Sequence, residues 1–362
     1  MKKLYTTPDF REYHKRKLRK LDRKNRIKRK LNTQEKRDRD NQRKLFYNYK
    51  KNKNEPLPLY APKDFRLIDN PTYCLNFFRD VRSHENIFYH NKQKQVIISL
   101  VDVQLIDYAT ISALIAISDD LKSKKIILRG DFPVNPDCKK YIIESGFLTH
   151  MVDERNRQFA KQSKSEFIFF EKGCGKLSRK ESKNISELIK DVVEYLTGEK
   201  KNIKPLKTIL LEICGNSIEH AKTKDKQWLL GVKYENKKVI FTVTDVGKGI
   251  LETLYINNAA LMGNLIKMKS KLEILKGAFT QRYGSSTQEE NRNKGLPAIK
   301  VNSDFGTIKN LIVLTNNVIL HFENNDESST FSPGTPRFKG TMYQWELTED
   351  CIINTINYYV EN

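Results

Sequence analysis

The chain has 362 residues, enough for two ordinary domains, and its 38% hydrophobic content supports a packed core. Lysine and arginine outnumber aspartate and glutamate by 66 to 44, and this net charge of +22 suggests an anionic partner such as nucleic acid or nucleotide. The five cysteines form no CxxC pair and the six histidines do not cluster, which argues against a disulfide framework or a zinc site.

Residues 1–56 come first in chain order and form a basic arm. They hold 22 Lys and Arg against 7 Asp and Glu, and so supply 15 of the 22 net positive charges. We expect a solvated helix or a disordered segment. Leu18, Leu21, Ile27 and Leu31 recur at roughly helical spacing, so one reading is a basic amphipathic helix on nucleic acid phosphates or on an acidic membrane or protein surface. The other reading is a solubilising tail.

Residues 57–160 are predicted to form a small α/β unit. The apolar run 96–103 is typical of a buried strand, 110–124 has helical periodicity, and 124–132 is the next expected strand. Strand, helix and strand in this order make a βαβ unit with a parallel sheet. A short helix is expected over 138–148.

The most apolar stretch, residues 96–117, does not suit a membrane. It contains Asp102, Gln104 and Asp107, which a bilayer interior strongly disfavours. No apolar segment typical of a secretory signal follows the basic N-terminus. We therefore expect a cytoplasmic protein with no integral membrane segment.

Residues 161–362 are predicted to form an α/β sandwich, with helices on one face of a mixed sheet. Two amphipathic helices precede a hairpin that turns near Asn236, and a helix-and-loop insert then leads to three late strands. The expected ranges are 186–198, 206–222, 227–236, 238–247, 251–294, 308–317, 318–324 and 340–347.

The strongest chemical motif is LLEICGNSIEHA, residues 210–221. On a helix, Glu212, Asn216, Glu219 and His220 share one polar stripe. The side-chain oxygen of Asn216 can coordinate Mg²⁺, and a carboxylate one turn away can orient water. A stripe of ordinary surface residues is the alternative.

A second motif, DVGKGI, begins at Asp245 directly after a predicted strand. Gly247 and Gly249 permit a positive φ and a close approach to a ligand. The carboxylate of Asp245 can accept a hydrogen bond from an exocyclic amine. The position of this motif after Asn216, with a hairpin between them, strengthens the case for a shared site.

Two later clusters suit a phosphate site. A Gly/Ser/Thr cluster precedes a glycine that opens a helix, where backbone N–H groups point outward. A Gly-Thr pair then begins a late strand. The residues concerned are Ser285, Ser286, Thr287, Lys294, Gly295, Leu296 and Thr341.

Taken in order, these motifs resemble the boxes of the GHKL ATPases, the superfamily that includes gyrase, histidine kinases and MutL. Residues 210–221 resemble the N box, 245–250 the first glycine box, 293–300 the second, and 339–341 the last. The resemblance implies a Bergerat fold, in which ATP lies between the N-box helix and the sheet beneath a mobile lid. It also makes a homodimer an expectation, because many members dimerise.

The resemblance assigns roles to individual residues. Asn216 would hold Mg²⁺, Glu212 would be the general base, and Asp245 would bind the adenine amine. Gly247 and Gly249 would let the base approach. Lys294, Gly295 and Leu296 would line the phosphates beside Ser285, Ser286 and Thr287, and Thr341 would lie near Asp245.

The second glycine box departs from the family pattern. It has one glycine where two or three are usual, and Pro297 removes an N–H that could meet phosphate. This departure bears on turnover more than on binding.

Residues 96–117, with Asp107 opening a helix, resemble a STAS domain, the fold of anti-sigma-factor antagonists. That family often carries a phosphorylatable Ser or Thr just after this Asp, but here Tyr108 and Ala109 follow, and Thr110 comes next. The resemblance implies an interaction unit that phosphorylation does not switch at that position. The alternatives are an unrelated βαβ core and a plain N-cap role for Asp107.

The combined reading is an ATP-binding regulatory protein of class α/β, a STAS-like βαβ unit followed by a Bergerat-type sandwich. Closure of residues 251–294 over Mg·ATP would change the surface offered to a protein partner. ATP hydrolysis is favoured over phosphoryl transfer. Two alternatives stay open: a non-catalytic interaction module with a degenerate nucleotide site, and a Ser/Thr kinase resembling the anti-sigma-factor kinases.

Overall fold

The computed structural model divides the chain into two compact units, Met1–Leu57 and Pro58–Asn362. The described residues are 12, 13, 15–20, 22, 23, 25, 58–83, 95–151, 157, 159, 168–174, 178–221, 227–257, 269–280 and 295–361.

The described positions of the first unit, between residues 12 and 25, are helical and exposed. Arg16 donates to Glu12, one turn earlier, at 2.8 Å, as expected for a solvated helix. Leu18 is 53% exposed. The helical alternative therefore holds at these positions, whereas Leu21, Ile27 and Leu31 lie outside the described residues.

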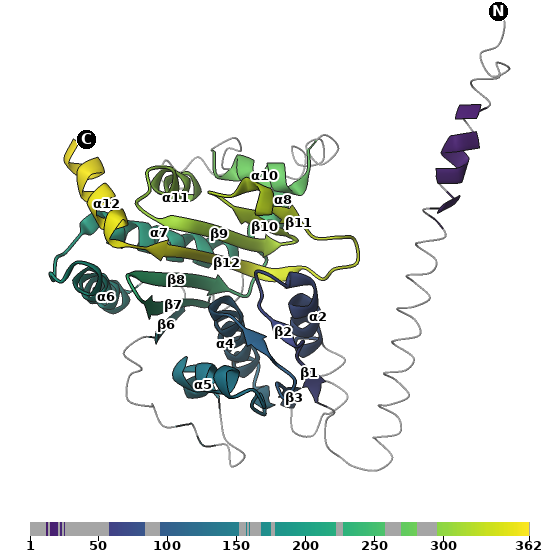
Figure 1. Ribbon diagram of the computed structural model, residues 1–362, viewed down its shortest axis with the longest axis horizontal. Coiled ribbons are helices and arrows are strands. Elements are labelled where there is room, and N and C mark those ends of the chain that lie inside the picture. Colours follow the sequence, from purple (N-terminus) through teal and green to yellow (C-terminus); the bar gives the residue numbers. More distant parts are fainter. Residues whose placement is uncertain are drawn as a thin grey trace, which may run out of the picture. The chain divides into compact units, whose positions relative to one another are not determined.

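The second unit begins with a small parallel sheet in the order β1-β3-β5 (Figure 1). Helix α4 (Tyr108–Ser123) connects β3 to β5 along the chain, as the predicted βαβ unit requires. The bounds are β1 Leu59–Tyr60, β3 Gln95–Ser99 and β5 Ile127–Gly130, with α2 Pro71–Val81, α5 Pro136–Glu144 and a 3-10 turn Phe147–His150. A separate parallel pair joins β2 (Asp64–Phe65) to β4 (Leu105–Ile106).

Helix α4 is buried at every position from Tyr108 to Leu121. A helix without a polar face must be covered on all sides, and α4 packs against β5 of the small sheet as well as against two strands of a larger sheet. Asp107 caps it, accepting from the Thr110 amide at 2.7 Å. The N-cap reading of Asp107 is therefore confirmed.

The larger sheet has seven strands in the order β11-β10-β9-β12-β8-β7-β6. Its pairings are all antiparallel, so the mixed sheet expected from the sequence is wrong: the last long strand, β12, enters between β8 and β9 and runs opposite to both. The bounds are β6 Ile168–Cys174, β7 Gln227–Glu235, β8 Lys238–Asp245, β9 Lys309–Asn316, β10 Val318–His321, β11 Ser329–Thr330 and β12 Phe338–Leu347.

Alternation along β8 separates the two faces of this sheet. Val239, Phe241 and Val243 enter a core that includes residues of α6 and α7, and the Phe241 ring stacks on Trp345 at 5.1 Å between centroids. Thr242 and Thr244 face α4 instead, where the Ser112 hydroxyl lies 3.1 Å and 2.9 Å from their hydroxyls.

The expectation that helices cover one face of this sheet is wrong. The second core joins α2, α4 and the small sheet to Leu229, Leu314 and Met342 on the other face of the large sheet. Apolar side chains on both faces require cover on both. The remaining helices have the bounds α6 Arg179–Thr197, α7 Lys204–Ala221, α8 Ile250–Asn257, α10 Lys271–Ala278, α11 Gly295–Asp304 and α12 Glu349–Glu361, with a 3-10 turn Asn325–Glu327.

The described chain is thus mixed α/β, as expected. Within it, no helix is both long and apolar enough to cross a bilayer. The expected domain boundary at residue 160 lies outside the described residues and stays a prediction.

Candidate functional site

A row of polar side chains crosses four strands at one end of the large sheet. Trp228 of β7 and Thr341 of β12 lie directly opposite Asp245 of β8, and Thr315 of β9 lies opposite Thr341. Directly opposite residues share a face, and Asp245 continues the alternation of Val243 toward α7. The apolar core beneath α7 therefore stops at this row of polar side chains.

Burial dominates the electrostatics of Asp245, which is completely inaccessible to solvent. Its Oδ1 accepts from the Gly247 amide at 3.0 Å. Burial raises the pKa of Asp245 from 3.8 to about 8, although the Gly247 amide, the neighbouring Thr341 and the charge of Arg82 act in the opposite direction. The carboxyl group is therefore held close to its titration point at neutral pH.

Asn216 faces Gly295 across the contact between α7 and α11. A Cβ atom on Gly295 would lie 2.5 Å from Oδ1 of Asn216, too close for any other residue type without movement. Asn216 is 9% exposed, so the polar stripe predicted on this helix is not a surface stripe at this residue. Two of the predicted motifs are thus brought into direct contact.

Several buried polar atoms on this side of the sheet have no hydrogen-bond partner among the described residues. Native folds leave few such atoms, and a functional site is one place where they occur. They are Asn216 Nδ2, Trp228 Nε1, Asp245 Oδ2 and Tyr343 Oη.

The glycine turn after Asp245 is held by β9. Gly249 has φ 80°, and a Cβ there would lie 2.7 Å from Thr315 Oγ1 and 2.8 Å from Asn316 Oδ1. The first amides of α8 donate to these oxygens, from Ile250 to Thr315 at 3.0 Å and from Leu251 to Asn316 at 3.1 Å. The turn and the helix start are therefore fixed together.

Gly340 provides the second close approach. It has φ 141°, and a Cβ there would lie 2.0 Å from the carbonyl oxygen of Asp245. Its own carbonyl accepts from Thr315 Oγ1 at 3.1 Å. Glycine at this position lets β12 reach β8 beside the buried carboxyl group and places Thr341 next to it.

The other predicted site residues that the structure describes differ in exposure. Glu212 is exposed on α7, one turn before Asn216, while Gly247 and Leu296 are half-buried. No group of three or more His, Cys, Asp or Glu in the described part of the chain could hold a metal ion, and the predicted ligand Asn216 is not of that kind. Ser285, Ser286, Thr287 and Lys294, and most of the insert 251–294 except α8 and α10, lie outside the described residues.

Three side chains that contact the glycine turn or the start of β12 were not predicted from the sequence. Thr315 and Asn316 end the strand β9 as Thr-Asn-Asn, a polar break in an apolar run that could have marked them. Arg82 follows α2, donates to the Lys339 carbonyl at 3.1 Å and pairs with Asp120 at 3.2 Å. Since its partners lie far along the chain, no local signal identifies it.

No family model, curated protein or solved structure matches the chain.

Proposed function

We propose that the chain binds ATP with Mg²⁺ on the α7 side of the large sheet. The observation that carries this proposal is the pair of buried, unpartnered atoms at the two motifs, Nδ2 of Asn216 and Oδ2 of Asp245. Leaving a buried polar atom unpaired costs about 1–3 kcal/mol, which a ligand with matching groups would recover.

The residues present fit such a ligand. Oδ2 of Asp245 would accept from the exocyclic amine of adenine beside Thr341, and Gly249 and Gly340 keep the backbone around it compact. Asn216 would offer its side-chain oxygen to Mg²⁺ while its Nδ2 remains free to donate. The metal would neutralise phosphate charge at the start of α11, where Gly295 begins the helix.

The fold proposed for this site is a Bergerat-type sandwich preceded by a STAS-like unit. The contact between α4 and β8 supports a regulatory role, because Thr244, which faces Ser112, directly precedes Asp245. Nucleotide binding at Asp245 would then change the packing of the unit that carries α4. That unit would present the surface for a protein partner. A cytoplasmic location, a homodimer and nucleic acid contact through residues 1–56 belong to the same proposal.

Hydrolysis is the favoured chemistry, with Glu212 as the general base. It is exposed on α7, one turn from Asn216, so it is free to contact solvent water. General base catalysis is typically worth ~10²–10⁴ in rate. Glu212→Gln should therefore keep ATP affinity and lose turnover, with Glu349→Gln, an exposed glutamate on α12, as the matched control.

Incubation of the full chain with γ-labelled ATP separates the three functions. Free labelled phosphate, lost in Glu212→Gln, supports the ATPase. Label on the protein or on an added partner indicates a kinase. Binding without either product indicates a regulatory module that only binds nucleotide, and absence of binding refutes the proposal.

A further inference from the structure

A cavity of about 630 Å³ opens on the face of the large sheet opposite the Asp245 row. Its floor crosses five strands, from Lys233 on β7 through Ile240 on β8, Gln344 on β12 and Ile312 on β9 to His321 on β10. Neighbouring strands are ~4.8 Å apart, so the floor is roughly 19 Å long. This is the volume of a small-molecule site with an elongated shape.

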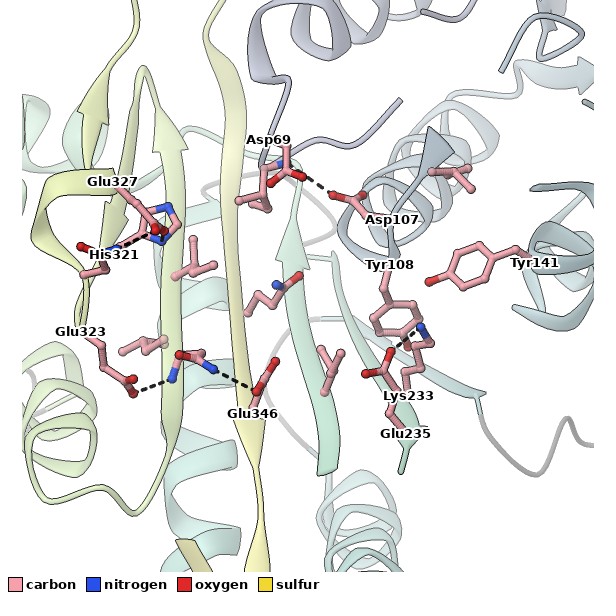
Figure 2. A pocket seen from close by; sticks show the side chains of 18 residues that line it. Asp69, Asp107, Tyr108, Tyr141, Lys233, Glu235, His321, Glu323, Glu327 and Glu346 are labelled. Carbon is pink, nitrogen blue, oxygen red and sulfur yellow. Dashed lines mark hydrogen bonds and ion pairs between the residues drawn. The ribbon is translucent and has the colours of Figure 1, made fainter. Parts of the chain in front are cut away.

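The cavity is acidic in a chain whose net charge is +22. Lys233 is the one Lys or Arg among the described residues that line it, but Arg66 pairs with Asp69 at 2.6 Å and Lys238 pairs with Glu346 at 2.9 Å from beside the cavity. Burial lowers the pKa of His321, so this ring adds little charge at neutral pH, and burial also raises the pKa of Asp107. Figure 2 shows the carboxylates spread along the cavity rather than gathered at a point. They are Asp69, Asp107, Glu235, Glu323, Glu327 and Glu346.

The spacing of three glutamates follows the strands. Glu235 belongs to β7 and Glu346 to β12, two strands away, while Glu323 follows β10, two strands beyond β12. The backbone steps across the strands are therefore ~10 Å each. The first two carboxylates lie closer together than that, because the Lys238 ammonium lies 3.5 Å from Oε2 of Glu235 and 2.9 Å from Oε1 of Glu346 and so bridges them. Ile240 of β8 and Ile312 of β9 lie on the intervening strands and line the floor, so carboxylate and aliphatic surface alternate along the cavity.

One end of the cavity already holds an alkylammonium group. The Lys233 Nζ lies 4.9 Å from the centroid of the Tyr141 ring and 2.6 Å from Oε1 of Glu235. A ring face and a carboxylate together make a favourable ammonium site. Farther along, Glu323 accepts from the Asn310 amide at 2.6 Å and Glu346 from Lys238 at 2.9 Å. A carboxylate has about four acceptor positions, so both glutamates can take further donors.

We propose that this cavity binds an aliphatic polyamine. Its ammonium groups would pair with Glu346, with Glu323 and with the neighbouring Glu327, and its methylene segments would cover Ile240 and Ile312. A single metal ion fits less well, because no three His, Cys, Asp or Glu in the described chain come close enough together to hold one. An extended peptide fits less well because β8, β12 and β9 are paired on both sides, leaving no free strand edge on the floor.

The test is calorimetric titration of the full chain with spermine, without nucleotide because polyamines bind phosphate. We expect saturable binding at one site, weakened about ten-fold by Glu346→Gln and by Glu323→Gln, since each removes one charged hydrogen bond. Glu349→Gln, outside the cavity, should bind as the wild type does. The proposal would be overturned if all three variants bound spermine with equal affinity. It would also be overturned if Mg²⁺ at the same total concentration of positive charge displaced spermine, or if a Lys/Arg peptide bound more tightly than spermine.

A second measurement needs no variant. A carbodiimide activates a carboxylate and couples it to an amine held beside it, with loss of water. Mass spectrometry after treatment with equimolar spermine should find the amide on Glu323, Glu327 or Glu346 and not on Glu349. Adducts spread over exposed carboxylates in proportion to their accessibility would show that spermine has no site here. Neither experiment depends on ATP binding, so its failure would leave the proposed nucleotide site untouched.

Discussion

A Cβ atom on Gly295 would lie 2.5 Å from Oδ1 of Asn216, so a larger residue at the start of α11 would have to displace the Asn216 side chain on α7. Gly295→Ala should displace α11 or rotate Asn216, lowering stability by about 1–3 kcal/mol and weakening ATP binding. Differential scanning fluorimetry with and without Mg·ATP measures both effects.

Gly215→Ala is the matched control, because a Cβ there meets nothing within 4 Å on the same helix. Alanine in a helix interior should raise stability by about 0.5–1 kcal/mol and leave ATP binding unchanged. If Gly295→Ala behaves as Gly215→Ala does, the contact between Gly295 and Asn216 is not close.

The buried carboxyl group of Asp245 predicts a pH dependence of stability. The pKa of Asp245 rises from 3.8 in the unfolded chain to about 8 in the folded chain. The stability that this group contributes to the folded state is therefore fully present below pH 4 and is lost as the pH rises toward 8. Asp245→Asn does not titrate. Relative to wild type, the variant should therefore gain on the order of 5 kcal/mol between pH 4 and 8 and no more above it. Urea unfolding across this range is the measurement, and a constant difference between the two proteins would refute the shifted pKa.

Nucleotide binding should share this dependence. An amine that donates to Asp245 favours the charged carboxylate, so ATP should bind more tightly as the pH rises from 7 to 8 and then level off. Protons should be released on binding, which calorimetry in two buffers of different ionisation enthalpy detects. Asp245→Asn should bind adenine nucleotides more weakly at every pH, because an amide can present its donor end.

The segment at the start of α4 should not be a phosphorylation switch. Tyr108 is buried, and the Thr110 hydroxyl donates to the Phe65 carbonyl at 2.6 Å and accepts from the Leu67 amide at 2.9 Å. A phosphate there would break both bonds and bury charge. Mass spectrometry of the protein from cells should find these two residues unmodified, and phosphate on Thr110 would contradict the prediction.

The basic arm should bind nucleic acid through phosphate alone. With 22 Lys and Arg in residues 1–56, affinity for DNA or RNA should fall steeply with salt and show no sequence preference. A chain that begins at residue 57 should lose this binding and keep ATP binding. If the shortened chain still bound DNA or RNA, or if binding did not depend on salt concentration, the arm would not be the nucleic acid site.

Local pattern was enough to predict most elements. The hairpin at Asn236, the helix that carries Asn216 and the strand that ends at Asp245 all lie within a few residues of their expected positions. Apolar periodicity and turn residues act over short distances, so a sequence reports them directly.

Contacts between distant segments were not predicted. The burial of α4 against β8 joins Ser112 to Thr244, 132 residues away, and Thr315 and Asn316 hold a turn 65 residues earlier in the chain. Such pairs produce no periodic pattern in the sequence, because each contact depends on how two complete helices or strands pack together. The antiparallel entry of β12 between β8 and β9 has the same origin.

The most direct test of the nucleotide site is calorimetric titration of the full chain with Mg·ATP, repeated with Asn216→Ala and with EDTA in place of Mg²⁺. We expect one saturable site in the wild type and weakened binding in both controls, because Asn216→Ala removes the proposed protein ligand of Mg²⁺ and EDTA removes the metal itself. Absence of saturable heat in the wild type, or equal Mg²⁺-dependent affinity in Asn216→Ala, would contradict it.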